Sequence, residues 1–446
     1  MYYILNPNIA LRSWQGLPFA YYIKGSAEPH GLSEEQFFTL IKCDGDTDID
    51  PSELYEGAPV SPCIKGEAKL TPWQEHMICN NRCFPMINLM LTGRCNYNCI
   101  HCFNAIDNAP LQSEFSFDEA KDLIEQARQC GVTAFMLTGG EPMVHRNFYD
   151  IVSLIYQKGM YVSRINTNAS LIDAKALDSL DKIGCRPLMK ISFDGIGYHD
   201  MMRGVRGAEE RTLTAIKLCI ERGFRVMVQT NVNSLNLSSM LPTAELLDSY
   251  GVSTMRVIRT SESPRWDINC YGKTLSFEDY YSSMLELTAA YKGKMKLDVW
   301  QMLELEGNSL SITAVKTCSP NDVICQGNRR MAAIASSGEL YPCNQLSGLF
   351  ESDGISLGNV KKTPLRELFS KGAYLDAVCM TVKDITDLDN ECRECRYLPL
   401  CNGGCRVLAY CSSGSYTGKD LSKCIFFKEG WYDKTKKLQK EIMNHG

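Results

Sequence analysis

The sequence lacks several features that would place it in common protein classes. Its formal net charge is only −5 and its pI is near 5.8, so no basic surplus favours nucleic acid as a partner. The longest apolar runs, such as INLML, are far too short to cross a bilayer. The stretch MYYILNPNIALRSW has no basic segment followed by an apolar one, so we expect no signal peptide. We therefore expect a cytoplasmic protein with neither a nucleic-acid nor a membrane partner.

Cysteine, by contrast, is abundant, with 21 among 446 residues. Disulfide frameworks belong to small secreted domains, and this long chain is not one. Buried thiols that pack as small apolar side chains explain seven of the cysteines: Cys43, Cys63, Cys130, Cys185, Cys219, Cys270 and Cys379. The others are spaced too regularly for that role, which indicates ligation of metal in a reducing, low-oxygen cytoplasm.

Three regions of the chain differ in their pattern of apolar and polar residues, and we expect domains at residues 1–85, 86–310 and 311–446. The first region reads as the short strands YYILN, IALRSW and FAYYIKG, followed by a helix in LSEEQFFTLIKCDG. Ser33 can cap the start of that helix and Gly45 can end it. The third region is irregular and ends in WYDKTKKLQKEIMN, which we expect to form a surface helix.

The middle region alternates between strand and helix patterns. Six apolar, β-rich runs are separated by helical patterns such as SFDEAKDLIEQARQCG: MINLMLTG, TAFMLTGG, MYVSRINTN, LMKISFDG, FRVMVQTNVN and STMRVIRT. This alternation predicts an α/β fold with a parallel sheet. Six units are too few for a closed eight-stranded barrel but suit a partial (β/α)6 barrel, whose chemistry would sit at the carboxyl ends of the strands.

A trio of cysteines follows the first of these runs. The stretch LTGRCNYNCIHCFN places Cys95, Cys99 and Cys102 at a CxxxCxxC spacing. Four thiolates saturate a structural zinc or a cubane cluster, whereas three leave one metal position open for chemistry. A zinc site would need His101 as its fourth ligand, in an awkward place between two other ligands.

The segment CNYNCIHC resembles the signature of the radical S-adenosylmethionine (SAM) enzymes. The resemblance implies that Cys95, Cys99 and Cys102 hold a [4Fe–4S] cluster whose fourth iron binds the amino and carboxylate groups of SAM. It also implies an activity: one electron cleaves SAM to methionine and a 5′-deoxyadenosyl radical, which takes a hydrogen atom from the substrate. A flavodoxin- or ferredoxin-type protein would donate that electron.

The ends of the later runs match the same family, although each residue alone could belong to a solvated loop. TGGEP resembles the motif that contacts the SAM amino group, and glycines allow a close approach of the backbone. NTN, SFDG and QTNVN end the next three runs, and HDMMRG follows SFDG. The resemblance thus implies SAM contacts from nine residues: Gly139, Gly140, Glu141, Asn168, Ser192, Asp194, Arg203, Gln229 and Asn231.

The third region resembles the SPASM domain, which binds auxiliary iron–sulfur clusters. Cys325 is followed by Gly338 and Cys343, and then by a CxxCx5Cx3C motif and a final cysteine. By family pattern, one [4Fe–4S] cluster would use Cys318, Cys325, Cys343 and Cys405, and the other Cys392, Cys395, Cys401 and Cys424. Cys318 lies outside the core motif, and without it the first cluster would keep an open iron. We interpret Cys411, Cys79 and Cys83 as thiols rather than as further metal or redox sites.

Members with a SPASM domain mostly modify peptides or proteins. The first region resembles a small, winged-helix-like domain that captures the leader of a precursor peptide as an added strand, although it could also be a decoration of the barrel. Sulfatase maturases carry an Asp after the cysteine that matches Cys343, and Asn344 stands there instead. We therefore expect a maturase that forms a thioether, carbon–carbon or ether crosslink, or an epimerised centre. A sulfatase-type protein maturase and a non-enzymatic iron–sulfur carrier or scaffold are the alternatives; no catalytic base is apparent.

Overall fold

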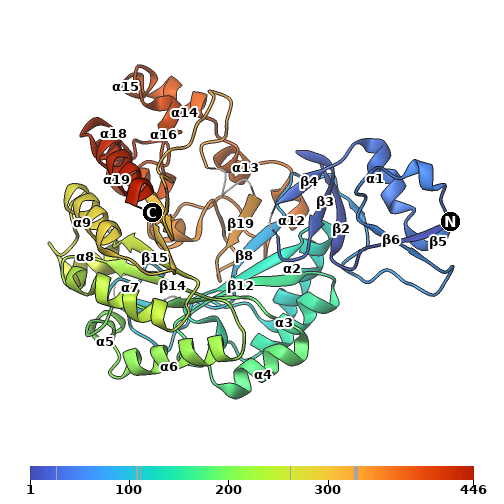
Figure 1. The fold of residues 1–446 in the computed structure, drawn as a ribbon, viewed down its shortest axis with the longest axis horizontal. Coiled ribbons are helices and arrows are strands. Elements are labelled where there is room, and N and C mark those ends of the chain that lie inside the picture. Colours follow the sequence, from blue (N-terminus) through green and yellow to red (C-terminus); the bar gives the residue numbers. More distant parts are fainter. Residues whose placement is uncertain (27, 107–108, 111, 262, 326–329, 446) are drawn as a thin grey trace.

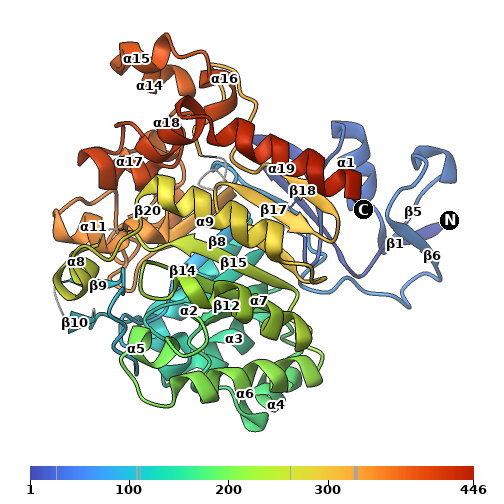
Figure 2. The ribbon, with the colours of Figure 1, turned by 60° about the vertical axis from the view of Figure 1, so that its left-hand side comes forward.

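The computed structural model of the chain describes residues 1–26, 28–106, 109–110, 112–261, 263–325 and 330–445. A barrel-like sheet forms the centre, and the N-terminal region lies beside it (Figure 1). In Figures 1 and 2 the C-terminal helices gather on the side of the barrel away from α4 (Ala174–Ile183) and α6 (Ala208–Glu221).

The N-terminal region contains two small sheets and one α-helix among its described residues. One sheet has the order β5-β1-β6 and the other β4-β3-β2-β7. The elements are β1 (Tyr2–Leu5), β2 (Ile9–Trp14), β3 (Leu17–Ile23), β4 (Pro29–Gly31), α1 (Glu34–Ile41), β5 (Asp44–Asp48), a 3-10 turn (Pro51–Glu53), β6 (Val60–Cys63) and β7 (Met77–Ile78). The three expected strands form, but further strands rather than further helices follow α1.

The predicted start of helix α1 is confirmed and its predicted end is wrong. The Ser33 hydroxyl accepts a hydrogen bond from the Gln36 backbone, and the Gln36 side chain accepts one from the Ser33 backbone, which completes a capping box. The helix ends at Ile41, with Lys42 as its C-cap, rather than at Gly45. Gly45 lies instead within β5, which pairs with β1. Its φ of +89° and the close approach of the Ala68 carbonyl leave no room for a side chain, which explains the glycine.

All six predicted strands of the middle region form and lie side by side in parallel. They are β8 (Met86–Met90), β11 (Ala134–Thr138), β12 (Tyr161–Thr167), β13 (Leu188–Ser192), β14 (Val226–Val232) and β15 (Thr254–Arg259). Parallel strands β19 (Met331–Ile334) and β16 (Lys296–Val299) extend this set at its two sides. The sheet remains open, since β18 (Ser309–Ser311) and β20 (Leu340–Tyr341) stand at the opposite ends of the strand order, with β17 (Leu303–Glu306) beside β18.

Helices cover the outer face of the sheet and create the main apolar core. This core joins alternate strand residues such as Leu89, Leu137 and Ile191 to buried helix residues such as Leu123 and Ile216. The helices that contribute to this core are α2 (Phe117–Gln129), α3 (Phe148–Gln157), α4, α6, α7 (Met240–Ser249) and α9 (Phe277–Ala290). The shorter helices α5 (His199–Arg203) and α8 (Pro264–Cys270) contribute no described residue to it. Because side chains alternate along a strand, the residues between these apolar ones face the barrel interior.

Short helices dominate the C-terminal region. They are α11 (Ser347–Ser352), α12 (Leu365–Leu368), α13 (Ala373–Val378), α14 (Val382–Leu388), α15 (Asn390–Arg393), α16 (Leu398–Cys401), α17 (Arg406–Ser413), α18 (Leu421–Lys428) and α19 (Trp431–His445). The expected terminal helix is α19, which packs on α9 and β18. Within the described residues, no helix is long and apolar enough to span a membrane.

Cys79 and Cys83 lie between the N-terminal region and the barrel. Both pack with the buried rings of Trp14 and Tyr22, and the Cys79 thiol donates to the Gln129 carbonyl over 3.5 Å. This packing agrees with their interpretation as structural thiols.

Candidate active site

The loop after β8 brings Cys95, Cys99 and Cys102 together. The Cys99 and Cys102 thiols are close enough to Cys95 to raise its pKa, and the Cys99 thiol likewise raises the pKa of Cys102. Burial, aided by these neighbouring sulfurs, raises the pKa of Cys95 to about 12 and that of Cys102 to about 11. Because ligand thiols must be deprotonated, loading of metal on this loop requires the release of protons.

Gly139 and Gly140, which follow β11, pack directly against this loop. The Gly140 amide donates to the Thr92 carbonyl over 2.8 Å, and the Glu141 amide donates to the Arg94 carbonyl over 2.9 Å. A Cβ atom on Gly140 would collide with the Gly93 and Arg94 carbonyls. Glycine is therefore required here by the close approach of the two backbones.

The Glu141 side chain is completely buried behind the loop. Its carboxylate accepts hydrogen bonds from the Thr167 hydroxyl at 2.9 Å and from the Asn168 amide at 2.7 Å. Burial nevertheless raises the pKa of Glu141 to about 7, although these bonds and one from the Met143 amide oppose the rise. A carboxylate held in this way favours a cationic ligand group nearby.

A buried ion pair links the end of β13 to the cysteine loop. Arg203 Nε lies 2.8 Å from Asp194 Oδ2, and both residues are buried. Arg203 Nη1 donates to Cys99 Sγ over 3.6 Å, whereas Nη2 has no hydrogen-bond partner among the described residues. Arg203 therefore contacts the cysteine loop and keeps one buried donor available for an anionic group.

Asp194 is held from several sides. Its Oδ1 accepts from the Asn231 amide at 3.0 Å, and His101 Nε2 lies 3.7 Å from its Oδ2. Burial would raise the pKa of Asp194, but Arg203, His101 and His199 outweigh it and lower the pKa below the usual value. The side chain is fully enclosed, which makes Asp194 a positioning residue for Arg203.

The other expected SAM contacts lie around the same loop. Asn168 Nδ2 donates to Asn96 Oδ1 over 2.9 Å and is 3.7 Å from Cys95 Sγ. Ser192 and Gln229 are register partners on β13 and β14 and are partly buried, on the interior side of the strands. Asn231 contributes its backbone to Asp194. Eight of the nine residues therefore lie at or near the carboxyl ends of β11 to β14, and Arg203 lies on α5. Their contacts with SAM stay a prediction.

Two residues that carry no motif also support the loop. Asn104 Nδ2 donates to the Gly139 carbonyl over 3.0 Å. Arg265, on α8, donates from Nη2 to both oxygens of Asn98. Asn104 lies two residues after Cys102, but nothing in its spacing signals the contact, and Arg265 reaches the loop from far along the sequence.

Three of the four cysteines expected at the first auxiliary site come together. Cys325 and Cys405 both affect the ionisation of Cys343, whose pKa is raised to about 12 by burial. Cys318 instead packs with Ile324 and Leu398, and its thiol donates to the Leu398 carbonyl over 3.4 Å. The structure thus groups Cys325, Cys343 and Cys405 without Cys318.

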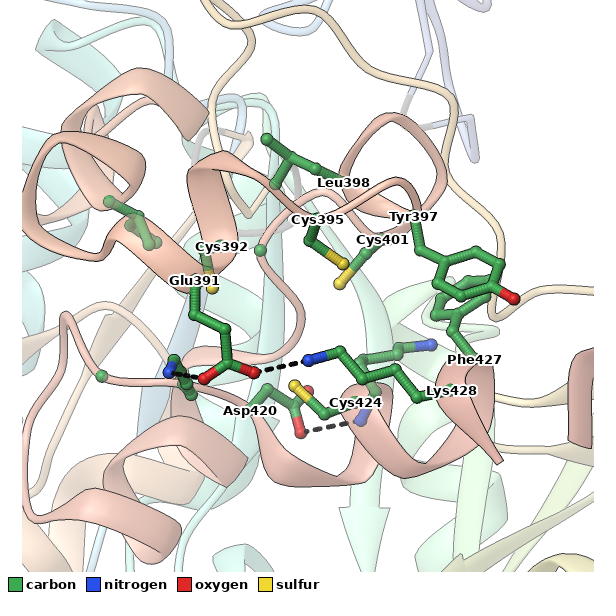
Figure 3. A pocket seen from close by; sticks show the side chains of 15 residues that line it. Glu391, Cys392, Cys395, Tyr397, Leu398, Cys401, Asp420, Cys424, Phe427 and Lys428 are labelled. Carbon is green, nitrogen blue, oxygen red and sulfur yellow. Dashed lines mark hydrogen bonds and ion pairs between the residues drawn. The ribbon is translucent and has the colours of Figure 1, made fainter. Parts of the chain in front are cut away.

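The four cysteines expected at the second auxiliary site line one pocket. Figure 3 shows Cys392, Cys395, Cys401 and Cys424 with their sulfur atoms turned toward a shared space. At the rim, Glu391 pairs with Lys419 and with Lys428, each over 2.5 Å. The Lys428 pair joins α15 to α18, and the Lys419 pair joins α15 to the segment just before α18, which carries Cys424.

The donor groups fit iron–sulfur clusters better than single ions. Within the described ranges, no group of three or more Cys, His, Asp or Glu side chains could hold one metal ion. In a cubane each thiolate binds its own iron, so the sulfurs need not converge on one point. Nitrogen donors directed at Cys95 and Cys99 are also typical of clusters, whose potentials depend on hydrogen bonds to sulfur.

Two family models match the chain. The radical SAM superfamily model covers residues 89–247 and the SPASM iron–sulfur cluster-binding domain model covers residues 325–396. The first match includes the cysteine loop and the strand ends described above. The second ends before Cys401, Cys405 and Cys424.

Related proteins include two curated enzymes and one solved complex. An AdoMet-dependent heme synthase from Methanosarcina barkeri is 28% identical over 75% of this chain and 95% of its own length. A PqqA peptide cyclase from Granulibacter bethesdensis is 22% identical over 73% of this chain and 83% of its own length. The crystal structure of Streptococcus suis SuiB bound to precursor peptide SuiA has a TM-score of 0.68 and 15% identity, covering 95% of this chain and 99% of SuiB.

Proposed function

Since the chain belongs to the radical SAM superfamily and carries a SPASM domain, we propose that it is a maturase of a ribosomally made peptide. The observation that carries this proposal is the extent of the SuiB likeness. A match over 95% of the chain leaves about 22 of 446 residues outside it, so most of residues 1–85 must share that fold. SuiB was solved with a precursor peptide, which supports a peptide-binding role for the N-terminal region here.

The proposed site divides its work among the residues around the loop. Cys95, Cys99 and Cys102 would hold one [4Fe–4S] cluster, which supplies, together with SAM, a 5′-deoxyadenosyl radical that takes a hydrogen atom from the peptide. Glu141 would bind the SAM ammonium group and Arg203 Nη2 its carboxylate, because each presents the opposite charge. Ser192, Gln229 and Asn168 would orient the rest of SAM.

Formation of a crosslink requires the substrate to lose two hydrogens. The first hydrogen leaves as an atom and ends on deoxyadenosine; the second leaves as a proton, and its electron must go to an acceptor. The two auxiliary sites would take that electron, giving three clusters with the one on the Cys95 loop. A crosslinked peptide is then lighter by two hydrogen atoms, whereas epimerisation leaves its mass unchanged.

A tetrapyrrole-modifying activity is the second candidate. The heme synthase relative matches over 95% of its own length, which favours it. A quarter of this chain lies outside that match, whereas the SuiB likeness covers 95% of it, so we place the peptide first. The sulfatase-type alternative is disfavoured by Asn344, which cannot accept a proton as a carboxylate does.

The test is turnover under anaerobic conditions. Reconstituted protein with SAM and dithionite is incubated with each short peptide encoded beside the gene, or with iron coproporphyrin III, and products are read by mass spectrometry. A modified peptide and deoxyadenosine support the proposal, and Cys102→Ala should abolish both while the control Cys63→Ala retains them. If deoxyadenosine accumulates with every peptide unchanged in mass and chirality, peptide maturation is refuted; absence of SAM cleavage would favour an electron carrier.

A further inference from the structure

The interior of the barrel contains charged side chains that the proposed reaction does not use. They are Arg164 on β12, Lys190 on β13, Arg256 on β15 and Asp298 on β16. Asp298 is buried, whereas Arg164, Lys190 and Arg256 are partly buried. Charged groups inside a protein are usually paired or bind a ligand. This set therefore needs an explanation.

Strand alternation places Arg164 and Lys190 on the interior face. Their neighbours Ile165, Met189 and Ile191 are completely buried in the core under the helices, so the residues between them point the opposite way. Lys190 is the register partner of Asn166, which lies two residues after Arg164 on the same face. Lys190 thus lies one layer below Ser192, an expected SAM contact.

The charges inside the barrel do not balance. Arg256 Nε and Asp298 Oδ2 form an ion pair of 2.6 Å, which satisfies both. Among the described residues, neither the Lys190 nor the Arg164 side chain has an ion pair or hydrogen bond, and Arg164 Nε is buried without a partner. When Lys190 is protonated, three cations against one carboxylate leave two positive charges unmatched.

Uncharged groups on the same face are also unsatisfied. Asn166 Oδ1 and Asn88 Oδ1 are buried without hydrogen-bond partners in the described part of the chain. Buried polar atoms are nearly always paired in native proteins, so several orphans on one interior wall indicate a place for a bound group. The unmatched cations indicate that this group is anionic.

Electrostatics places this wall beside the first auxiliary site. Burial, together with Arg164 and Arg256, lowers the pKa of Lys190 to about 7, while Asp298 and the Cys343 thiol oppose the change. An anion bound at Lys190 would restore its ordinary basicity. Lys190 therefore lies near both Ser192, an expected SAM contact, and the Cys343 thiol.

We propose that Lys190 and Arg164 bind a carboxylate of the substrate and fix its position inside the barrel. The choice of carboxylate rests on the proposed function, because the anionic side chains of a peptide are Asp and Glu. The same chemistry is present in the propionates of a tetrapyrrole, the second candidate. SAM also carries a carboxylate, but Arg203, which lies on α5 and contacts the cysteine loop, already offers a free donor for it.

Binding of small probes tests this site without turnover. Reconstituted, SAM-loaded protein is titrated by calorimetry with N-acetyl-glutamate methylamide and with the uncharged N-acetyl-glutamine methylamide. Iron coproporphyrin III is titrated separately and followed by its Soret absorbance. The variants are Lys190→Met, Arg164→Met and the conservative Lys190→Arg; Lys296→Met, whose ammonium group already pairs with Glu304, is the matched control.

Binding of a peptide carboxylate predicts that the wild type prefers the glutamate probe. Its affinity should fall about tenfold or more in Lys190→Met and Arg164→Met. It should be retained in Lys190→Arg and Lys296→Met. The same dependence seen only with the porphyrin would support a propionate. The inference is overturned if neither probe binds, if the Lys190→Met and Arg164→Met variants bind the probes as tightly as the wild type, or if Lys190→Met lowers the affinity for SAM itself. If the glutamate probe binds through Lys190 but no peptide is modified, the proposed function is refuted while the carboxylate site remains supported.

A second measurement distinguishes loss of the binding site from misfolding of the variant. Lys190 is partly buried, and removing an unpaired charge at such a position relieves its desolvation. Lys190→Met should therefore raise the melting temperature of ligand-free protein. The glutamate probe should then stabilise the wild type and leave Lys190→Met unchanged. A lowered melting temperature in Lys190→Met would mean that the ammonium group already has a stabilising partner, which contradicts the inference.

Discussion

Arg203 and Asp194 form a buried ion pair of 2.8 Å that ties the end of one strand to the cysteine loop. Arg203 is 7% exposed and Asp194 is inaccessible. Through Nη1 the same guanidinium group reaches Cys99. The pair therefore couples the position of a cluster ligand to the sheet, and its loss should affect both stability and cofactor binding.

Asp194→Asn should destabilise the protein and weaken SAM binding. Removing one partner of a buried ion pair leaves an uncompensated charge and costs about 3–5 kcal/mol. The folded-state pKa of Asp194 is lowered, so its contribution is present above its unfolded pKa near 3.9 and is lost as pH falls through the lower folded value. Denaturant unfolding at pH 7 and pH 3 should show a large deficit for the variant at pH 7 that shrinks at pH 3.

Asp248→Asn is the control for this substitution, since Asp248 caps a loop by accepting from Lys294 and Met295 and lies outside the site. It should leave the affinity for SAM unchanged. Equal SAM affinity in wild type and Asp194→Asn would contradict a positioning role for Asp194.

Glu141→Gln should separate stability from function. Because the pKa of Glu141 is raised to about 7 in the fold, the folded state resists ionisation that the unfolded chain undergoes near pH 4.3. Wild-type stability therefore falls, through this group, as pH rises from about 4.3 to about 7. The stability of Glu141→Gln relative to wild type should grow over that window by up to about 4 kcal/mol and then remain constant.

The same substitution should weaken SAM binding by about tenfold or more, since a charged hydrogen bond to the ammonium group is lost. Unfolding without SAM and calorimetry with SAM measure the two effects. A stability difference that is independent of pH would show that Glu141 titrates normally, and would contradict its burial as the cause of the shift.

Gly140→Ala should prevent cluster assembly on the Cys95 loop. The new Cβ would meet the Gly93 and Arg94 carbonyls, so the loop must move away from β11. Such overpacking costs about 1–3 kcal/mol and displaces Cys95. Iron analysis should show about four irons fewer than wild type. Gly16→Ala, where no atom lies within 4 Å of the added carbon, should keep the full content; equal iron in both variants would refute the argument.

The fold was predictable where local pattern determines it. The six β-rich runs are continuous, end in polar or glycine-rich residues and alternate with helical patterns, so each was recognisable alone. The pairing of β19 with β8 was not, because Met331–Ile334 is short and its partner precedes it by more than 240 residues. Likewise Gly45 resembles a helix stop, and only the pairing of β5 with β1 shows that it lies in a strand instead.

The site was predictable to the extent that motifs fix it. The CxxxCxxC motif and the strand-end residues predict where SAM would bind, and the SPASM spacing identified the four cysteines that line one pocket. Lys190 was missed because a single lysine in LMKISFDG is compatible with a strand edge. Its burial becomes evident only when neighbouring strands enclose it. Arg265 has no motif at all and reaches Asn98 through the packing of α8.

The role of Cys318 can be decided by counting iron. Three cubane clusters predict about twelve irons per chain. In the structure the Cys318 thiol bonds to the Leu398 carbonyl and packs apart from Cys343 and Cys405. We therefore expect Cys318→Ala to retain about twelve irons and Cys343→Ala to fall to about eight, with Cys219→Ala, a buried thiol on α6, as the unchanged control. About eight irons in Cys318→Ala would mean that this residue leaves Leu398 to complete the first auxiliary cluster, whereas twelve would mean that the cluster keeps an iron open to a substrate or solvent ligand.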